Sequence, residues 1–205
     1  MSDYIEVIAI VEGKTEQIFV KSVLAPYLAE KGVYISPTQV TKPGQKGGDV
    51  KYSRVKRDIK IHLKQRMDTY VTTFVDYYGI KEWSGINNVP AGLSPLGISE
   101  HINQATTDKV NNSFSNQQSE RRFIPFIAMH EFEALLFSDS ALLAEAIGAD
   151  EDEIEDVLGE CGEPEAVNNS RHTAPSKRLD GWSENGKFAK TTKGIAIARA
   201  IGIEK

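Results

Sequence analysis

The first part of the chain alternates short apolar runs with longer stretches in which apolar residues recur at helical spacing. A run rich in β-branched residues, such as "IEVIAIV", is typical of a central parallel strand, because both of its faces are buried. Apolar residues three and four positions apart predict helices that lie against such strands. The expected elements are strands over 5–11, 33–41 and 70–75, with helices over 15–30 and 52–66.

The pattern changes near residue 139. Before it, a helix is expected over about 97–110, and "RFIPFIAM" is predicted to form a fourth buried strand that runs into a helix, "HEFEALLF". After it, the apolar spacing is helical only. We therefore expect an α/β domain over 1–139, with a mostly parallel sheet of about four strands flanked by helices, and a C-terminal helical appendage over 140–205.

Composition narrows the class of protein. The chain has 205 residues, 40% of them hydrophobic, and its single cysteine, Cys161, excludes an internal disulfide framework and a cysteine-rich zinc site. No apolar stretch approaches the roughly 20 residues that span a bilayer, and no secretory signal is seen near Met1. The sequence therefore predicts a cytoplasmic protein without a membrane span.

Charge is unevenly distributed, although the net charge is only −5. Residues 42–66 hold nine Lys or Arg against two acids, residues 145–165 ten acids and no base, and residues 171–205 eight bases against three acids. The basic segments could converge on a phosphate backbone, or each could be an ordinary solvated helix face. The acidic segment would repel nucleic acid, so we expect it to be a solvated helix or to meet a basic face of a partner.

The stretch "VEGKTE" places Glu12 directly after the first predicted strand and Glu16 one helical turn later. It is not a phosphate-binding P-loop, because Ile8 stands where Gly-x-x-x-x-Gly-Lys-Ser/Thr requires its first glycine. Asp76 follows the third predicted strand. The carboxyl ends of parallel strands form the ligand crevice of open α/β sheets, so these acids are expected on one rim.

Two further acids, Glu131 and Glu133, follow the fourth predicted strand and would complete a group of five carboxylates. Singly, such acids are explained by a helix dipole, a loop cap or an exposed helix face. Together they would repel one another unless a cation neutralised them, and all-oxygen ligands suit Mg²⁺ or Mn²⁺, as one or two ions. Zinc is disfavoured because Ala134 stands where a helical zinc motif needs its second histidine.

Four stretches, "VEGKTE", "FVDYYG", "HEFEALLF" and "APSKRL", carry a resemblance to known proteins. Together they resemble the Toprim fold of topoisomerases, primases and overcoming-lysogenization-defect (OLD) nucleases, and in particular the bacterial family called domain of unknown function 4276. The resemblance implies a Toprim-like, Rossmann-like fold and two-metal hydrolysis of nucleic acid, with Glu12 and Asp76 on one ion. Glu16, Glu131 and Glu133 would lie nearer the second ion.

The sequence departs from the usual Toprim pattern at Tyr78, which occupies the second acidic position of Asp-x-Asp. This departure weakens the resemblance to topoisomerases and primases more than that to OLD nucleases, whose second ion draws on later acids. The tyrosine ring could stack on a base or pack against the protein.

Basic residues are expected to balance the charge of a phosphorane-like transition state and to hold the substrate. Lys177, a candidate catalytic residue, and Arg178, a candidate nucleic-acid contact, lie in "APSKRL", where ordinary helix capping is the alternative. Lys46, Lys51 and Arg54 lie in or shortly after the glycine-rich "GQKGG", and they are expected to contact the nucleic-acid backbone.

Together these inferences predict a Mg²⁺-dependent nuclease that cleaves phosphodiester bonds of DNA or RNA. The OLD resemblance implies a role in bacterial anti-phage defence with an ATPase, and this sequence has no Walker motif, so the ATPase would be a separate protein. One alternative is a non-catalytic Toprim module that binds nucleic acid or a protein partner. Another is a primase-like nucleotidyl transferase, which the incomplete Asp-x-Asp disfavours. The choice between DNA and RNA and the formation of a homo-oligomer are left open by the sequence.

Overall fold

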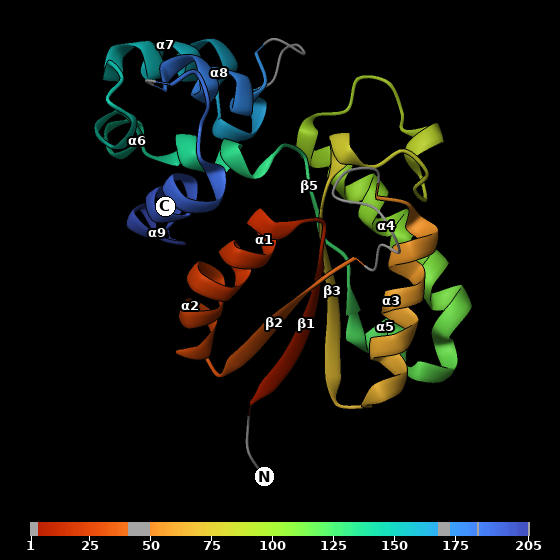
Figure 1. The fold of residues 1–205 in the computed structure, drawn as a ribbon. Helices are drawn as coiled ribbons and strands as arrows, with labels where there is room; N and C mark the ends of the chain where they lie inside the picture. The colour runs from red at the N-terminus through yellow and green to blue at the C-terminus, as the bar shows by residue number, and fades with distance from the viewer. Residues whose placement is uncertain (1–3, 41–49, 168–172, 184, 205) are drawn as a thin grey trace. The chain divides into compact units, whose positions relative to one another are not determined.

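The computed structural model of the chain forms two compact units (Figure 1). It describes residues 4–40, 50–167, 173–183 and 185–204. The units are Met1–Met129 and His130–Lys205. The boundary expected after residue 139 lies inside the second unit.

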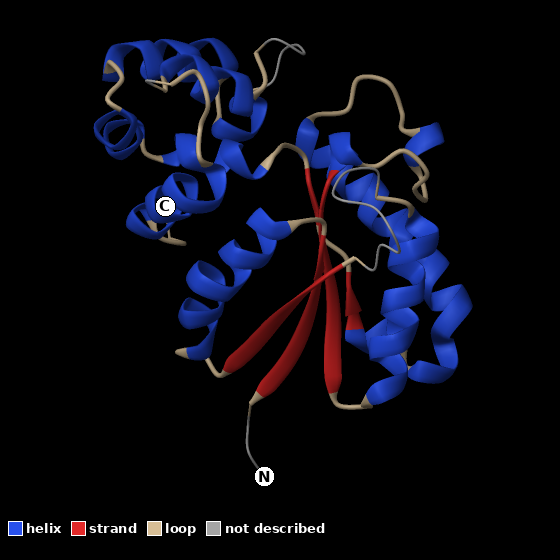
Figure 2. Ribbon diagram, in the orientation of Figure 1, coloured by secondary structure: helices blue, strands red, loops and turns tan. Residues whose placement is uncertain are grey.

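A parallel sheet forms the centre of the first unit (Figure 2). Its strands are β1 (Ile5–Val11), β2 (Val33–Gln39), β3 (Thr69–Asp76), β4 (Phe123–Ile124) and β5 (Ile127–Ala128). They lie in the order β2-β1-β3-β4, β5 also pairs with β3, and each of these pairings is parallel. The predicted α/β fold, with a mostly parallel sheet of about four strands, is confirmed.

The fourth predicted strand is interrupted in the structure. "RFIPFIAM" forms two strands of two residues each, β4 and β5, on either side of Pro125. Proline has no N–H to donate to a strand ladder, so regular pairing stops there. The Thr73 side chain bridges the gap, because its hydroxyl donates to the Phe126 carbonyl and accepts the Phe126 N–H, both at 3.1 Å.

Helices cover both faces of this sheet (Figure 1). One face is covered by a continuous helical stretch, which the sequence predicted over 15–30. This stretch consists of α1 (Lys14–Phe19), a π-helical turn (Val20–Leu24) and α2 (Ala25–Ala29). On the other face lie α3 (Tyr52–Gln65), α4 (Pro95–Phe114) and α5 (Ser119–Arg122). Short 3₁₀ turns occupy Tyr77–Gly79, Ile86–Asn88 and Ser115–Gln117.

The core of the first unit involves the sheet together with α3 and α4. Along β3 every second residue is buried, which is the burial pattern of a strand with one face fully covered. The buried cluster joins residues of β1, β3, α3 and α4, among them Ile10, Val71, Val75, Ile59, Leu63, Ile102 and Val110. This packing holds β1 and β3 side by side, so that their carboxyl ends fall at the same edge of the sheet.

A buried arginine joins three segments of the first unit. Arg122 is 4% exposed, and its guanidinium donates to the backbone carbonyls of Leu63, Arg66, Thr69 and Gln117. The last carbonyls of a helix have no partner within that helix, and α3 ends at this place. Arg122 therefore connects the end of α3 to the start of β3 and to the turn that precedes α5.

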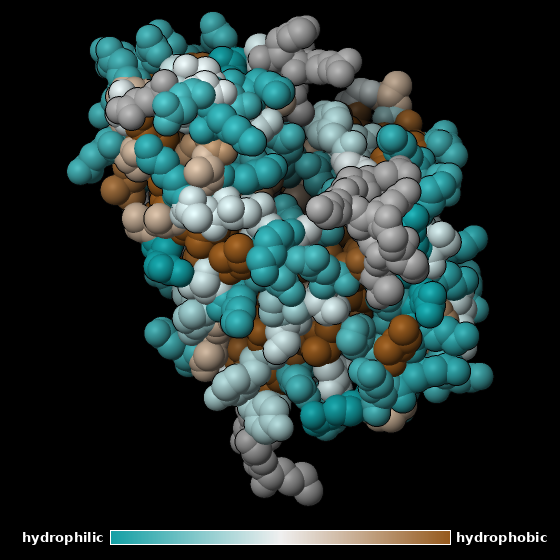
Figure 3. Space-filling model, in the orientation of Figure 1, coloured by the Kyte–Doolittle hydropathy of each residue, from teal (hydrophilic) through white to brown (hydrophobic). Residues whose placement is uncertain are grey.

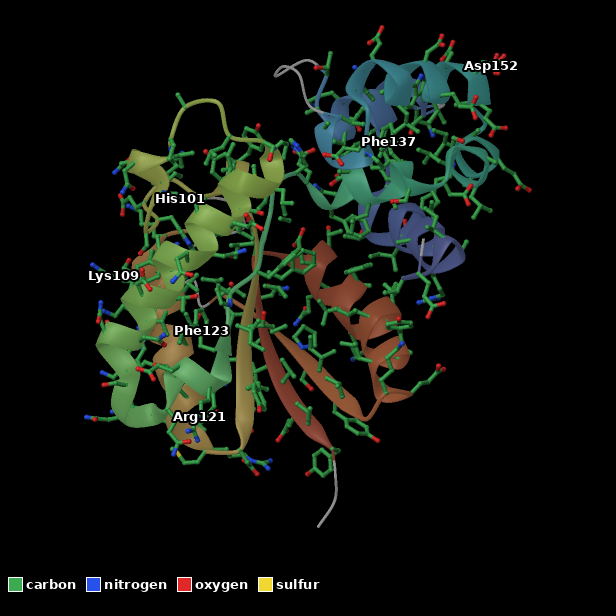
Figure 4. The ribbon with its side chains drawn as sticks, turned by 180° about the vertical axis from the view of Figure 1, so that it is seen from behind. His101, Lys109, Arg121, Phe123, Phe137 and Asp152 are labelled. Atoms are coloured by element: carbon green, nitrogen blue, oxygen red, sulfur yellow. The ribbon has the colours of Figure 1, made fainter. Side chains whose placement is uncertain are left out.

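We expect Arg122→Met to lower the free energy of unfolding by about 3 kcal/mol or more, because several buried carbonyls lose their donor. Arg121, the preceding residue of α5, is exposed (Figure 4). Arg121→Met should therefore change the free energy of unfolding by less than about 0.5 kcal/mol. Urea unfolding followed by circular dichroism measures both variants. Similar small losses in the two would show that the carbonyls do not depend on Arg122.

The second unit consists of helices in its described part. They are a 3₁₀ helix (Phe132–Ser138), α6 (Ser140–Ile147), α7 (Glu151–Cys161), a 3₁₀ turn (Pro164–Ala166), α8 (Pro175–Trp182), a π-helical turn (Lys190–Gly194) and α9 (Ile195–Ile201). No described residue beyond Ser138 lies in a strand, as the helical spacing predicts. The helix predicted at "HEFEALLF" begins at Phe132, after its N-cap Glu131, and is of the 3₁₀ type. No helix among the described residues is both long enough and apolar enough to cross a membrane.

The acidic helix α7 is amphipathic. Asp150 caps it by accepting the Asp152 N–H at 3.1 Å. Ile154 and Val157 are buried, whereas the acids of the helix are exposed, and Asp152 points outward (Figure 4). Hydrophilic residues dominate the visible surface of this part of the unit (Figure 3). The helix therefore packs through its apolar side and presents negative charge to solvent.

Candidate functional site

Glu12 and Asp76 stand at the carboxyl ends of neighbouring strands. β1 and β3 pair in parallel with Val11 opposite Phe74, so the chain leaves both strands at the same edge. The Asp76 N–H donates to Glu12 Oε2 at 3.3 Å, and the Glu12 N–H donates to the Phe74 carbonyl at 3.3 Å. The structure thus brings these two acids together at the edge where open α/β sheets bind ligands.

Glu16 lies in the first turn of α1, close to the residue that follows Glu12. Its Oε2 is 3.1 Å from the position that a β-carbon on Gly13 would occupy. Gly13 is the N-cap of α1 and has no side chain with which to cap it. A carboxylate in a first helical turn is stabilised by the helix dipole, so the position of Glu16 also has a structural explanation.

Gly79 leaves room for the Glu12 carboxylate, a role that the sequence pattern did not reveal. A β-carbon on Gly79 would lie 2.9 Å from both carboxylate oxygens of Glu12, which is closer than real β-carbons approach. In the same turn, the Tyr78 N–H donates to Asp76 Oδ1 at 2.8 Å. The turn after β3 therefore orients Asp76 and accommodates Glu12. The glycine in "DYYG" was the available clue, since glycine permits close approach to the backbone.

Glu131 and Glu133 make contacts within the second unit. The Glu131 carboxylate accepts the N–H of Ser176 at 3.2 Å, at the start of α8. Glu133 is 2% exposed, and its carboxylate lies 3.0 Å from the Lys190 ammonium. Burial raises the pKa of Glu133, and Lys190 opposes that rise. No motif in the sequence marked Lys190, because its partner is distant along the chain.

The predicted basic residues of the second unit contact groups of their own helix and the segment before it. The exposed Lys177 ammonium lies 3.6 Å from the Asp180 carboxylate, and surface pairs of this kind contribute little to stability. Arg178 Nε donates to the Thr173 carbonyl at 3.1 Å. Arg178 therefore holds the chain at the start of α8, whereas Lys177 extends into solvent.

The predicted basic residues of the first unit lie at the start of α3. The Lys51 ammonium is 2.8 Å from the Glu82 carboxylate, and both side chains are solvent-accessible. Arg54 Nη1 is enclosed and has no hydrogen-bond partner among the described residues. Lys46 lies outside the described residues. Contact of this group with nucleic acid stays a prediction.

The Glu12 and Asp76 carboxylates provide the hard oxygen donors that Mg²⁺ and Mn²⁺ prefer. In the part of the chain that the structure describes, no three His, Cys, Asp or Glu side chains are grouped closely enough to hold a metal ion. Mg²⁺ is commonly bound by only one or two carboxylates and completes its shell with water and substrate phosphate, which fits this pair. A single site formed by all five predicted acids stays a prediction, because two of them, Glu131 and Glu133, belong to the second unit.

The fold and this edge define an α/β protein with adjacent acids at the carboxyl end of a parallel sheet. The family model described as "Domain of unknown function (DUF4276)" matches residues 11–205, and the chain belongs to this family. Among solved structures, the chain is similar to the C-terminal region of the Xanthomonas campestris pv. campestris OLD protein, with 13% identity, 97% of each chain covered and a TM-score of 0.33. None of the curated proteins compared with the chain matches it.

We expect Gly79→Ala to lower the free energy of unfolding by about 1 kcal/mol, at the low end for an overpacked site, because the new methyl group would displace only the end of the flexible Glu12 side chain. Glu12→Asp withdraws the carboxylate by one methylene, so the double variant should lose less than the sum of the two single variants. Urea unfolding of the four proteins gives the coupling free energy. As a control, Gly159→Ala adds a methyl group with no neighbour within 4 Å and should be neutral or stabilising. Additive losses at Gly79 and Glu12 would contradict the contact.

Lys190→Met should lower stability by about 1–3 kcal/mol at pH 8, because the Glu133 charge is then buried without a cation. Removing the ammonium raises the folded-state pKa of Glu133 further above its ordinary value of 4.5. A raised carboxyl pKa destabilises the folded state progressively above the unfolded value of 4.5, and in full above the raised folded-state pKa. The loss of stability should therefore shrink as the pH falls to about 4. Melting temperatures across this range test the sign. Lys193→Met, at an exposed position of the same turn, is the control, and a loss independent of pH would contradict the charge argument.

Proposed function

We propose that this protein is a nuclease that hydrolyses phosphodiester bonds of DNA or RNA with Mg²⁺ or Mn²⁺. The observation that carries the proposal is the pair of acids Glu12 and Asp76 at the carboxyl edge of the sheet. The Glu12 carboxylate accepts the Asp76 N–H, and the Glu12 N–H donates to the Phe74 carbonyl. Such a pair offers oxygen ligands at the edge where open α/β sheets bind their ligands. The resemblance of the four sequence motifs to Toprim nucleases supports the same reaction.

In this proposal the residues of the first unit hold the ion and the substrate. Glu12 and Asp76 are the ligands of the first ion, and Glu16 is assigned to the second. A bound ion would neutralise phosphate charge and lower the pKa of a water molecule. Gly79 leaves room for the Glu12 carboxylate. Lys46, Lys51 and Arg54 would bind the nucleic-acid backbone.

In the second unit, Glu131 and Glu133 are proposed as further metal ligands. The hydrogen bond from Ser176 engages one Glu131 oxygen and leaves the other to bind an ion. Glu133 would have to exchange the Lys190 ammonium for a divalent ion. Lys177 and Arg178 are proposed to balance the negative charge of the transition state and to contact the substrate.

The proposed setting is bacterial anti-phage defence, in which the nuclease works with an ATPase. This part of the proposal rests on the resemblance of the motifs to OLD nucleases. The same resemblance assigns ATP hydrolysis to the ATPase, and residues 1–205 contain no Gly-x-x-x-x-Gly-Lys-Ser/Thr motif. The exposed acids of α7 offer that partner a negative surface rather than a site for nucleic acid.

A non-catalytic module that binds nucleic acid or a protein is the second candidate. The contacts of Glu131 with α8 and of Glu133 with Lys190 favour it, because carboxylates used within the fold are less available to a metal ion. The two candidates differ in one measurable respect. Only the nuclease requires a divalent ion at Glu12 and Asp76.

The nuclease proposal is tested with purified protein, alone and with its ATPase partner, on labelled single- and double-stranded DNA and RNA. We expect cleavage in Mg²⁺ or Mn²⁺ and none in EDTA. Glu12→Gln and Asp76→Asn should each reduce the rate by more than the roughly 10- to 100-fold that loss of an outer metal partner costs. Mg²⁺ at ten times its Kd should stabilise the parent protein by about 1.4 kcal/mol and Glu12→Gln by much less.

Glu6→Gln is the matched control, because Glu6 lies at the opposite end of β1 and the change also removes one negative charge. It should leave cleavage intact. Glu12→Gln should keep or raise the melting temperature, since it removes the repulsion between adjacent carboxylates. Unchanged cleavage in Glu12→Gln would remove Glu12 from the mechanism. Nucleic-acid binding without cleavage under all these conditions would favour the non-catalytic module.

A further inference from the structure

Tyr78 is an exposed aromatic residue between Asp76 and Gly79, the two residues whose backbone atoms lie against the Glu12 carboxylate. The Tyr78 side chain is 58% exposed, whereas the neighbouring Tyr77 packs against the core of the first unit. The sequence left two roles for this ring, packing and base stacking. The ring contacts Tyr77 but the residue stays mostly exposed, which favours stacking. Tyr78 therefore presents a solvent-exposed aromatic ring in the turn that follows Asp76.

The turn that carries Tyr78 is tied down on both sides. Before it, the Tyr78 N–H donates to Asp76 Oδ1 at 2.8 Å. After it, Ile80 is 4% exposed and forms a parallel bridge with Val50. An aromatic side chain on such a fixed backbone loses little conformational entropy when it binds, which favours its use as a contact residue.

Tyr77 supports the Tyr78 ring from one side. The two ring centroids are 5.3 Å apart and the ring planes are inclined by 80°, an edge-to-face arrangement.

We propose that Tyr78 stacks on an unpaired base of the nucleic acid at the Glu12–Asp76 edge, so that the substrate is single-stranded or locally unpaired. This inference rests on the proposed nuclease function and names its substrate class. In a duplex the faces of each base are covered by its neighbours, and an aromatic side chain can stack only on a base that has left the stack. Stacking tolerates any base, so the preference is for strand state rather than for sequence.

The test measures binding of labelled oligonucleotides of about 12 nucleotides, of the size that single-strand sites cover, as single strands and as duplexes. Glu12→Gln is the parent, so that no cleavage occurs, and fluorescence anisotropy gives Kd. Tyr78→Ala should weaken single-strand binding about tenfold, or about 1.4 kcal/mol, and duplex binding less than about twofold. Tyr78→Phe should retain the affinity. Tyr78→Leu, apolar but without a ring, should lose most of it.

Single abasic sites at successive positions of the strand identify the stacked base. At that position the parent and Tyr78→Ala should bind equally, because the base that the ring would contact is absent. Equal loss on single strands and duplexes, or full affinity in Tyr78→Leu, would overturn the stacking inference. Tight duplex binding that is unaffected by Tyr78→Ala would reject the stacking inference and leave the nuclease proposal standing. If neither the Glu12→Gln parent nor the wild-type protein binds nucleic acid, the stacking inference and the nuclease proposal are both wrong.

Discussion

The parallel pairing of β1 with β3 is the constraint on which the first unit depends. Its register is held by burial, because Ile10 of β1 and Val71 and Val75 of β3 belong to the core cluster shared with α3 and α4. A slip of one residue would turn these side chains out of the core. The same register carries Glu12 to the side of Asp76 at the carboxyl edge. Hydrophobic packing thus determines where two charged groups stand.

Glu12 and Asp76 are stabilised in a different way from the buried Glu133. In the first unit backbone N–H groups donate to the carboxylates, from Asp76 to Glu12 and from Tyr78 to Asp76. In the second unit the Lys190 ammonium neutralises Glu133. A backbone dipole can stay in place when a cation binds on another side of the carboxylate, but an ammonium has to leave. The Glu12 and Asp76 carboxylates are therefore better prepared than the Glu133 carboxylate to bind a divalent ion.

Elements with strong periodicity could be predicted from the sequence, because burial of whole faces leaves a pattern that spans many residues. β1, α3 and the helical stretch after Gly13 are of this kind. The 3₁₀ form of the helix Phe132–Ser138 could not be predicted, because apolar residues three positions apart suit both an α-helix and a 3₁₀ helix over so short a length. Nor could the contacts of Gly79 with Glu12 and of Lys190 with Glu133, which join segments far apart in the chain. Local pattern carries no information on such pairs.

The tyrosine at position 78 bears on how many ions the first unit can hold. An aspartate there would add a third carboxylate to the edge that carries Glu12 and Asp76, and with it the repulsion that a second ion relieves. Tyrosine removes that charge and leaves a pair of acids, which suits a single Mg²⁺ completed by water and phosphate. A second ion would then need carboxylates beyond this pair, and Glu16, Glu131 and Glu133 are the ones proposed for it. Tyr78 thus limits the negative charge of the edge and also places an exposed aromatic ring beside it.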